Sequence, residues 1–542
     1  MNRIIKKIRS YEISSSKFIL LSALYLSYVL NLAFFKTVFS NFEVSSFFQG
    51  LCLVLFIPVS MIPVYVLLNL VLFKYTIKTI SSILIFLSAA TNYFMFKMGT
   101  LIDLDMIQSI FETTLRESSD LITFPSICWT IIFGVIPILF LLAIKIKFLD
   151  FKKEFIKRGI IIGVGVVVLV GYIGVFGKTL FSFGRNNTKL RSQYNTLNYI
   201  VNTVRFTQEK LRPPREFKIL DDNVTSNIED NNVRVVVLVV GETAREKNFS
   251  LYGYERQTTP LLENNSEIIT IRNVFSCGTV TSRSVPCMFS SKGRDKFDVD
   301  DAKYEENLLD IIKKAGWDVV WYENDDGCKK ICNRIESYKS YKLGKNSRYC
   351  FDDYCFDDAL LEFMDDRLKQ IKQNTLIVLH TIGSHGPSYY KRYPREFAKF
   401  KPTCDTTDIQ KCSSQELINT YDNTILYTDY IINSAIERLK KYKNFHTSLM
   451  YASDHGESLG EKGMYLHGIP YSVAPDEQKR VPFILWLSKN TMDDMNIDFT
   501  CLKNKIWDRT SHDNWFHTAL GLTQTQTSLY DKSLDLVTEC RK

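Results

Sequence analysis

Three potential metal ligands directly follow two predicted strands in the second half of this chain. Glu242 comes after the apolar run 233–240, and Asp454 and His455 come after the run 448–452. Because the carboxyl ends of parallel strands meet at one edge of a sheet, these side chains should converge. Carboxylate oxygens and imidazole nitrogens are ligands that Zn²⁺ accepts in a tetrahedral shell. The pattern therefore predicts a zinc site that includes these three residues.

A short hydroxyl-rich segment offers the nucleophile that such a site can activate. Cys277 and Cys287 bracket it, and a bond between the two thiols would hold the hydroxyls at a fixed place. A hydroxyl bound to a metal ion is acidified, as bound water is, and becomes an alkoxide nucleophile near neutral pH. The spacing leaves four candidates open, which are Thr279, Thr281, Ser282 and Ser284.

Two further histidines lie near these predicted strand ends. His385 follows the run 375–380, and His467 lies in the segment 465–468. All seven histidines of the chain belong to its second half. A lone Glu after a strand, or an isolated Asp-His pair, is more often structural than catalytic. Their joint occurrence at strand ends favours a functional site.

Alternating apolar runs and helical segments should position these residues. The runs are short and rich in β-branched residues, which is typical of strands buried on both faces. The intervening lengths suit crossover helices, so we expect an α/β domain, an α/β/α sandwich with a mainly parallel sheet. The predicted strands are 233–240, 317–322, 375–380, 448–452 and 481–487.

The first 180 residues contain five apolar stretches of about 20 residues, a length that crosses the hydrocarbon core of a bilayer. Basic residues cluster before the first stretch, between the second and third, and between the fourth and fifth. Because basic loops stay in the cytoplasm, the N-terminus is expected there and everything after the fifth span outside. Since many basic residues lie in these clusters, the net charge of +8 indicates no nucleic-acid partner. The stretches are 17–36, 48–73, 79–98, 125–146 and 159–177.

Ten of the twelve cysteines follow residue 270. An even number in close pairs is typical of disulfides formed in an oxidising compartment, which agrees with the predicted topology. A zinc ribbon is the less favoured alternative, because the gaps are irregular and no C-x2-C pair occurs. The close pairs are Cys277/Cys287, Cys328/Cys332, Cys350/Cys355 and Cys404/Cys412, and Cys501/Cys540 remains by elimination.

Two segments connect the apolar and polar parts. Polar residues recur every four positions from Asp105 to Glu117, which predicts an amphipathic helix near 103–118 at the membrane surface. This helix either helps to hold a lipid headgroup or forms a solvated cap on the bundle. Residues 179–232 predict a bridging helix and a flexible joint. We therefore expect a transmembrane domain at 1–178 and a soluble domain at 233–542.

The motifs around these residues resemble those of the lipid A phosphoethanolamine transferases. This family belongs to the alkaline phosphatase/sulfatase superfamily and includes the mobile colistin-resistance enzymes. The resemblance covers essentially the whole chain and implies a zinc enzyme of the bacterial inner membrane with a periplasmic catalytic domain. We expect a monomer. The matching segments are 240–245, 277–287, 383–387, 453–458 and 465–468.

The resemblance also implies roles for single residues. It selects Thr281 as the nucleophile and as a zinc ligand beside Glu242, Asp454 and His455. His385 and His467 match histidines that contact the substrate or a second zinc ion, and we expect them to be catalytic. Substrate contacts are expected at Asn324, Lys329, Glu457, Ser109, Thr113 and Glu117.

The expected reaction is a two-step transfer. Thr281 attacks the phosphorus of phosphatidylethanolamine, diacylglycerol leaves, and a lipid A or lipooligosaccharide phosphate then takes the phosphoethanolamine from Thr281. The added amine weakens the attraction of the surface for cationic peptides, so polymyxin resistance is expected. Alternatives are the same chemistry on a core sugar or surface protein, a related membrane sulfatase or phosphodiesterase, and a membrane-anchored sensor without turnover.

Overall fold

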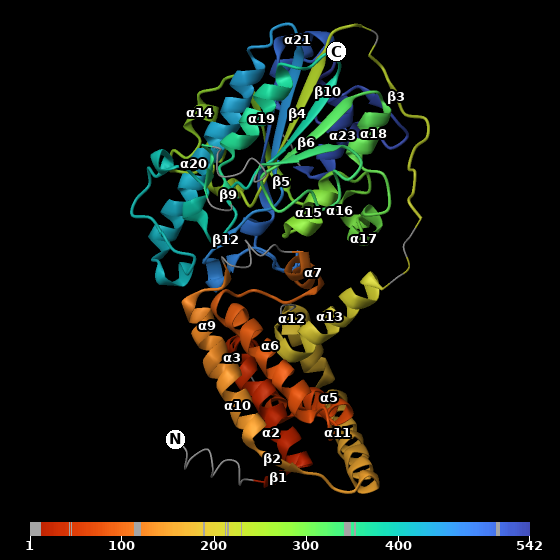
Figure 1. Cartoon of the computed structure of the whole chain (residues 1–542), viewed down its shortest axis with the longest axis vertical. Coiled ribbons are helices and arrows are strands. Elements are labelled where there is room, and N and C mark those ends of the chain that lie inside the picture. The colour runs from red at the N-terminus through yellow and green to blue at the C-terminus, as the bar shows by residue number, and fades with distance from the viewer. Residues whose placement is uncertain are drawn as a thin grey trace. The chain divides into compact units, whose positions relative to one another are not determined.

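The computed structural model describes residues 12–542 apart from 43, 45, 113–120, 188–189, 212, 214–215, 229, 341–347, 352–353 and 506–509. The chain forms two compact units. The first comprises Met1–Ile107 with Ile122–Lys210, and the second comprises Gln108–Leu121 with Leu211–Lys542. The first unit is built mainly of helices, whereas a sheet covered by helices forms the second (Figure 1).

Within the described residues, five segments of the first unit are long and apolar enough to cross a membrane. Their bounds lie close to the predicted ones, except at the fifth span. There the helix begins at Phe151, within the basic cluster instead of after it, because Lys, Arg and Glu are good helix formers. The segments contain α2 (Ser15–Tyr28) and α3 (Leu32–Asn41), α4 (Phe47–Ser60) and α5 (Ile62–Val71), α6 (Ile77–Lys97), α9 (Phe124–Thr130) and α10 (Ile136–Ala143), and α11 (Phe151–Asn186).

The connecting segments are also helical. Residues after the fifth span form α12 (Leu190–Gln193) and α13 (Asn195–Lys210), and Asn195 at the start of α13 donates hydrogen bonds to the carbonyls of Leu30 and Ser88. The predicted amphipathic helix is described as α7 (Leu104–Glu112). Thr113 and Glu117 lie outside the described residues.

An eight-stranded sheet forms the centre of the second unit, in the order β15-β5-β14-β11-β4-β10-β6-β7. The pairs from β11 to β7 are parallel, whereas β14 is antiparallel to both of its neighbours, so the prediction of a mainly parallel sheet is confirmed. The strands are β4 (Arg234–Gly241), β5 (Ile268–Phe275), β6 (Asp318–Glu323), β7 (Glu336–Lys339), β10 (Thr375–His380), β11 (His446–Ser453), β14 (Arg480–Leu487) and β15 (Thr510–Ser511).

Helices cover both faces of this sheet. Alternate residues of β4, namely Val236, Leu238 and Val240, pack in one core with α15 (Thr281–Met288), α18 (Leu308–Lys314) and α23 (Asp513–Leu522). On the other face, α19 (Asp358–Leu368) contacts β10 and α20 (Ser414–Leu439) contacts β11. Figure 1 shows α18 and α23 on one side of the strands and α19 and α20 on the other. Every residue of β4 is buried, which explains the apolar run that follows Arg234.

The second unit contains the five disulfides that the cysteine spacing predicts. They join Cys277 to Cys287, Cys328 to Cys332, Cys350 to Cys355, Cys404 to Cys412, and Cys501 to Cys540.

Candidate metal centre and nucleophile

The register of three parallel strands places the predicted ligands side by side. Gly241, the last residue of β4, pairs with Ser453, the last residue of β11. Glu242 and Asp454 therefore leave adjacent strands at the same level, and the backbone N–H of Asp454 donates to the Gly241 carbonyl at 2.8 Å. The convergence that the sequence predicts for this edge of the sheet is present in the fold.

Glu242, Asp454 and His455 are fully buried and offer one ligand atom each within 4.8 Å of one another. Nε2 of His455 lies 3.2 Å from Oδ2 of Asp454 and 3.6 Å from Oε1 of Glu242. Nδ1 of His455 donates to the Gly456 carbonyl at 3.0 Å, so Nε2 carries the lone pair in the neutral ring. The ring is thus oriented to present a donor atom to the two carboxylates.

Hydrogen bonds from neighbouring backbone groups also orient the carboxylate of Asp454. Its Oδ1 accepts from the backbone N–H groups of Thr243 at 3.1 Å and His455 at 2.7 Å. Its Oδ2 has no hydrogen-bond partner within the described part of the chain, although it is buried. A buried carboxylate oxygen without a partner is costly, and a cation at this point would remove that cost.

The electrostatics of the cluster favour a metal ion. Burial, reinforced by the charges of Asp454 and Asp325, raises the pKa of Glu242 well above its ordinary value. Burial also lowers the pKa of His455 well below its ordinary value, and His467 adds to this shift. A neutral imidazole beside crowded carboxylates is the donor set that Zn²⁺ accepts, so the residues fit the expected ion.

Thr281 is the first residue of α15, and its hydroxyl faces this cluster. Its Oγ1 lies 3.2 Å from Oε2 of Glu242 and 3.3 Å from Nε2 of His455. The first backbone N–H groups of a helix have no partner within the helix and attract anions. The start of α15 therefore combines a hydroxyl with a local positive potential, which suits attack on a phosphoryl group.

The other three hydroxyls of the segment have different partners. Thr279 donates to the Ile469 carbonyl at 2.7 Å, and Ser284 donates to the Asp454 carbonyl. Ser282 lies 3.2 Å from the hydroxyl of Ser109, which clusters with the second unit. Among these four, the geometry thus singles out Thr281 as the residue that faces the carboxylates.

His512 joins the Cys277–Cys287 segment to strand β11, a role that the sequence did not indicate. Its Nδ1 accepts from the Cys277 backbone N–H at 3.1 Å, and its Nε2 donates to the Ser453 carbonyl at 2.9 Å. Burial lowers the pKa of His512 to about 4, which keeps this ring neutral. The residue follows the two-residue strand β15, which is too short to produce a recognisable sequence pattern.

The two additional histidines lie next to the cluster. The ring centre of His467 lies 4.4 Å from that of His455 and 5.6 Å from that of His385. Oε2 of the fully buried Glu457 lies 3.2 Å from Nδ1 of His467. The antiparallel pair β12 (Ser458–Leu459) and β13 (Tyr465–Leu466) begins directly after Glu457 and ends directly before His467. Glu457 is therefore placed to orient the His467 ring.

Asn324 has structural partners inside the protein. Its amide donates to the Cys355 carbonyl at 3.0 Å and to Asp357 at 2.7 Å. Asp357 in turn accepts from the N–H groups of Ile382 and Gly383 and thereby holds the loop that carries His385. The sequence did not indicate this buried carboxylate. A substrate contact for Asn324 remains a prediction.

Lys329 lies in the short loop that the Cys328–Cys332 disulfide closes. Its ammonium donates to the Asp326 carbonyl at 3.1 Å. Against the effect of burial, the charge of His380 and, to a smaller extent, that of Lys329 lower the pKa of Asp325. A cation in this loop can attract a phosphate group, and its predicted substrate contact remains a prediction.

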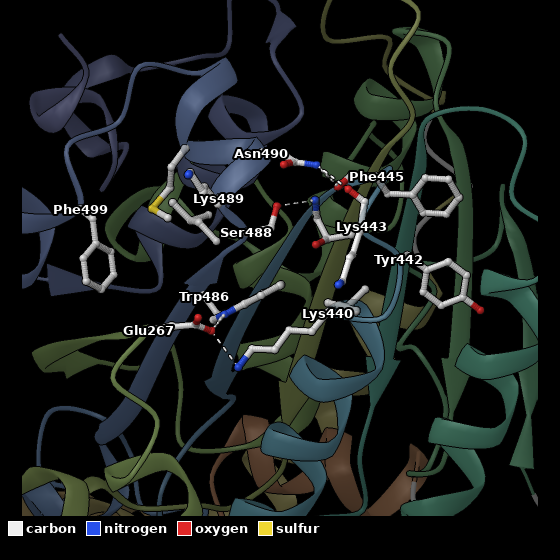
Figure 2. Close-up of a pocket in the computed structure, with 14 residues that line it drawn as sticks. Glu267, Lys440, Tyr442, Lys443, Phe445, Trp486, Ser488, Lys489, Asn490 and Phe499 are labelled. Atoms are coloured by element: carbon white, nitrogen blue, oxygen red, sulfur yellow. Dashed lines mark hydrogen bonds and ion pairs between the residues drawn. The ribbon is translucent and has the colours of Figure 1, made fainter.

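A separate pocket of about 480 Å³ lies at the opposite edge of the sheet, where β11 begins and β14 ends. Some of its polar groups are paired with one another, as Figure 2 shows for Lys440, Glu267 and Trp486. Lys440 lies 2.8 Å from Glu267, and the Trp486 indole N–H donates to the same carboxylate. This pocket is not part of the candidate metal centre.

The fold and the site are those of a sulfatase-type α/β domain. A family model described as "Sulfatase" matches residues 234–525 and agrees with this class. A second model, described as "Phosphoethanolamine transferase EptA/EptB", matches residues 60–211. The phosphoethanolamine transferase EptA of Escherichia coli K12 is 39% identical over 97% of this chain and 96% of its own length. The chain belongs to the phosphoethanolamine transferase family, which confirms the resemblance seen in its motifs.

Two other relatives extend this comparison. The phosphatidylethanolamine transferase Mcr-2 from Escherichia coli is 35% identical over 89% of this chain and 92% of its own length. The integral membrane lipooligosaccharide phosphoethanolamine transferase A of Neisseria meningitidis has a solved structure. It matches with a TM-score of 0.94 and 37% identity over 98% of this chain and all of that one. The five apolar helices thus belong to a membrane protein.

Proposed function

We propose that this chain transfers phosphoethanolamine from phosphatidylethanolamine to a phosphate of lipid A through a covalent intermediate on Thr281. The position of the Thr281 hydroxyl, 3.2 Å from Glu242 and 3.3 Å from His455, is the observation that carries the proposal. The family of the chain and the names of its relatives support the transferred group and the acceptor. Polymyxin resistance follows, because the added amine offsets a phosphate charge at the cell surface.

The first step forms a bond between Thr281 Oγ and the phosphorus of the donor lipid, while the bond from phosphorus to the diacylglycerol oxygen breaks. The Thr281 hydroxyl donates its hydrogen bond to Glu242, and this carboxylate takes the proton as the bond to phosphorus forms. His385 and His467, next to this group, protonate the leaving oxygen or hold the phosphoryl oxygens. In the second step an oxygen of the acceptor phosphate bonds to phosphorus, the bond from phosphorus to Thr281 Oγ breaks, and Glu242 returns the proton to this oxygen.

Glu242, Thr281, Asp454 and His455 would hold a zinc ion. When bound, zinc lowers the pKa of the hydroxyl and stabilises negative charge on the phosphoryl oxygens. The backbone N–H groups at the start of α15 attract the same phosphoryl group. Lys329 and Glu457 are proposed to bind the phosphate and the ethanolamine amine respectively, because their charges are complementary to these groups.

The proposed location is the inner membrane, with residues 233–542 as a catalytic domain in the periplasm and residues 179–232 as the connection. Five spans, with the basic loops on the same side of the membrane as the N-terminus, support this orientation. Five disulfides on the far side support an oxidising compartment. We further propose that the chain acts as a monomer and that Ser109, Thr113 and Glu117 contact a lipid headgroup.

Mass spectrometry of lipid A from a polymyxin-susceptible Gram-negative host tests this proposal. Expression of the chain should add phosphoethanolamine to lipid A and reduce polymyxin sensitivity, whereas the Thr281→Ala variant should do neither. Modification of a core sugar or a surface protein with unmodified lipid A would overturn the acceptor. Release of free phosphoethanolamine or sulfate without any modified acceptor would identify a hydrolase instead.

A further inference from the structure

A second group of buried ligand atoms lies beside the candidate zinc centre and shares one residue with it. Glu242 follows β4, Asp325 follows β6, and His380 is the last residue of β10, which lies between those two strands. Each offers one ligand atom within 4.8 Å of the other two. All three side chains are buried. The zinc site described above does not require Asp325 or His380.

His380 is oriented as metal-binding histidines commonly are. Its Nδ1 lies 3.0 Å from the Glu323 carboxylate, and Glu323 is fixed by the Trp321 indole N–H and the Asp325 backbone N–H. Because a carboxylate only accepts, Nδ1 carries the hydrogen, and in the neutral ring Nε2 holds a lone pair. A carboxylate that orients the far nitrogen of a histidine is the usual second contact of a metal-bound ring.

The free nitrogen of this ring points to the other members of the group. Nε2 of His380 has no hydrogen-bond partner within the described residues, and its side chain has no exposed surface. The nearest carboxylate oxygen, Oδ2 of Asp325, lies 4.0 Å away, beyond hydrogen-bonding distance. A separation of 4.0 Å is compatible with two atoms that bind the same metal ion, whereas two atoms joined by a hydrogen bond would lie closer together.

The crowding of acidic groups in this region is compatible with a second divalent ion. Four carboxylates, those of Glu242, Asp454, Glu323 and Asp325, are at most 6% exposed. One Zn²⁺ at Glu242, Asp454 and His455 offsets two of these charges, and buried charges without a partner are strongly destabilising.

We propose that Glu242, Asp325 and His380 bind a second divalent cation, for which a mixed nitrogen and oxygen donor set favours Zn²⁺. Glu242 then contributes a carboxylate to both ions. This site differs from the one that the family resemblance implied, in which His385 and His467 contact the substrate or a second zinc ion. The two-ion cluster would place positive charge on both sides of Glu242, next to the Thr281 hydroxyl.

Counting bound ions in the full-length protein tests the proposal without measuring activity. The purified chain is stripped with a chelator, titrated with Zn²⁺, passed through a desalting column and measured by elemental mass spectrometry. The parent protein should retain two ions per chain. The variants Asp325→Asn and His380→Gln should each retain one, and Asp454→Asn should lose the other ion.

The control is His446→Gln, which alters a histidine of a separate group with Asp230 and Asp494 at the far edge of the sheet. It should retain two ions, which excludes a general effect of removing a histidine beside carboxylates. Circular dichroism confirms that each variant is folded, and the isosteric Asp325→Asn provides a second route if His380→Gln misfolds. One ion in the parent, or two in both site variants, would overturn the proposal and leave a protonated His380 as the balancing charge.

Discussion

The hydroxyl oxygen of Thr281, the first residue of α15, lies 3.2 Å from Oε2 of Glu242, which directly follows strand β4. Thr281→Ala should lower the rate of transfer by about 1,000-fold or more, because alanine has no hydroxyl that could form the bond to phosphorus. Thr281→Ser should retain measurable turnover. Intact-protein mass spectrometry after incubation with phosphatidylethanolamine checks the covalent adduct. Thr279→Ala is the matched control, and an adduct on Thr281→Ala would disprove the assignment.

Glu457 lies 3.2 Å from Nδ1 of His467 and is fully buried. Glu457→Gln keeps the size of the side chain but removes its charge, so the ring is oriented less firmly. We expect kcat to fall by about 10- to 100-fold, as for other residues that orient an active-site histidine. Steady-state kinetics with a fluorescent donor lipid measure this change. Glu477→Gln, which breaks an exposed pair with Lys247, should leave kcat unchanged.

Removal of zinc should reduce both activity and stability. An ion present at 100 times its dissociation constant stabilises the folded state by about 2.7 kcal/mol, provided that the unfolded chain does not bind it. Chelation should therefore lower the Tm and abolish transfer, and added Zn²⁺ should restore both. Scanning calorimetry and a transfer assay on the same samples provide the test. Full activity in a sample shown to be metal-free would rule out zinc dependence.

The Cys501–Cys540 bond closes the longest loop of the five disulfides, with a sequence separation of 39. The loop-closure relation gives about 4 kcal/mol for this bond and about 2.5 kcal/mol for Cys404–Cys412, whose separation is 8. Replacing both cysteines of a pair by alanine should lower the free energy of unfolding more for Cys501–Cys540 than for Cys404–Cys412. Urea titration of the full chain measures the difference. The reverse order would show that native-state contacts, not loop closure, determine the effect.

Asp221 should make stability dependent on acid pH. Its carboxylate accepts hydrogen bonds from the Thr527 hydroxyl and from the backbone and hydroxyl of Ser528, which hold its pKa well below the usual range. In the unfolded chain the group titrates near about 3.9. Its contribution is therefore present above that pH and is lost as the pH falls further, because the unfolded state then binds more protons.

Asp221→Asn should lower the Tm at pH 7, and the difference from the parent should shrink as the pH is brought towards 3. Thermal unfolding followed by circular dichroism at both pH values measures this change. Asp222→Asn, one position further along the chain, is the control. A constant difference at both pH values would show that Asp221 acts only through its size and hydrogen bonds.

Much of the site could be predicted because buried strands have distinctive sequences. Every residue of β4 is buried, and its apolar run ends two positions before Glu242. All residues of β11 except His446 are buried, and its apolar run ends two positions before Asp454. Strand β5 escaped prediction because Arg272 and Asn273 are exposed and interrupt its apolar pattern, and all four residues of β7 are exposed. The hydrophobic pattern indicates which residues are buried but not the direction of a strand, so it could not predict that β14 is antiparallel to its neighbours.

The grouping of Asp325 and His380 with Glu242 depends on information that the sequence does not contain. Their strands are separated by more than fifty residues along the chain, and crossover connections place β10 between β4 and β6. Each residue alone is an ordinary polar residue near a strand end. Only the order and register of the strands show that they face one pocket.

Glu242 belongs to both groups of ligands, and this has a thermodynamic consequence. Two ions that share a carboxylate cannot bind independently, so occupancy of one position changes the affinity of the other by a factor that is the same in both directions. A cell that supplies little metal would then populate the empty, singly bound and doubly bound protein in proportions that no single dissociation constant describes. Glu242 would in this way determine how sharply the enzyme responds to the metal supply of its compartment.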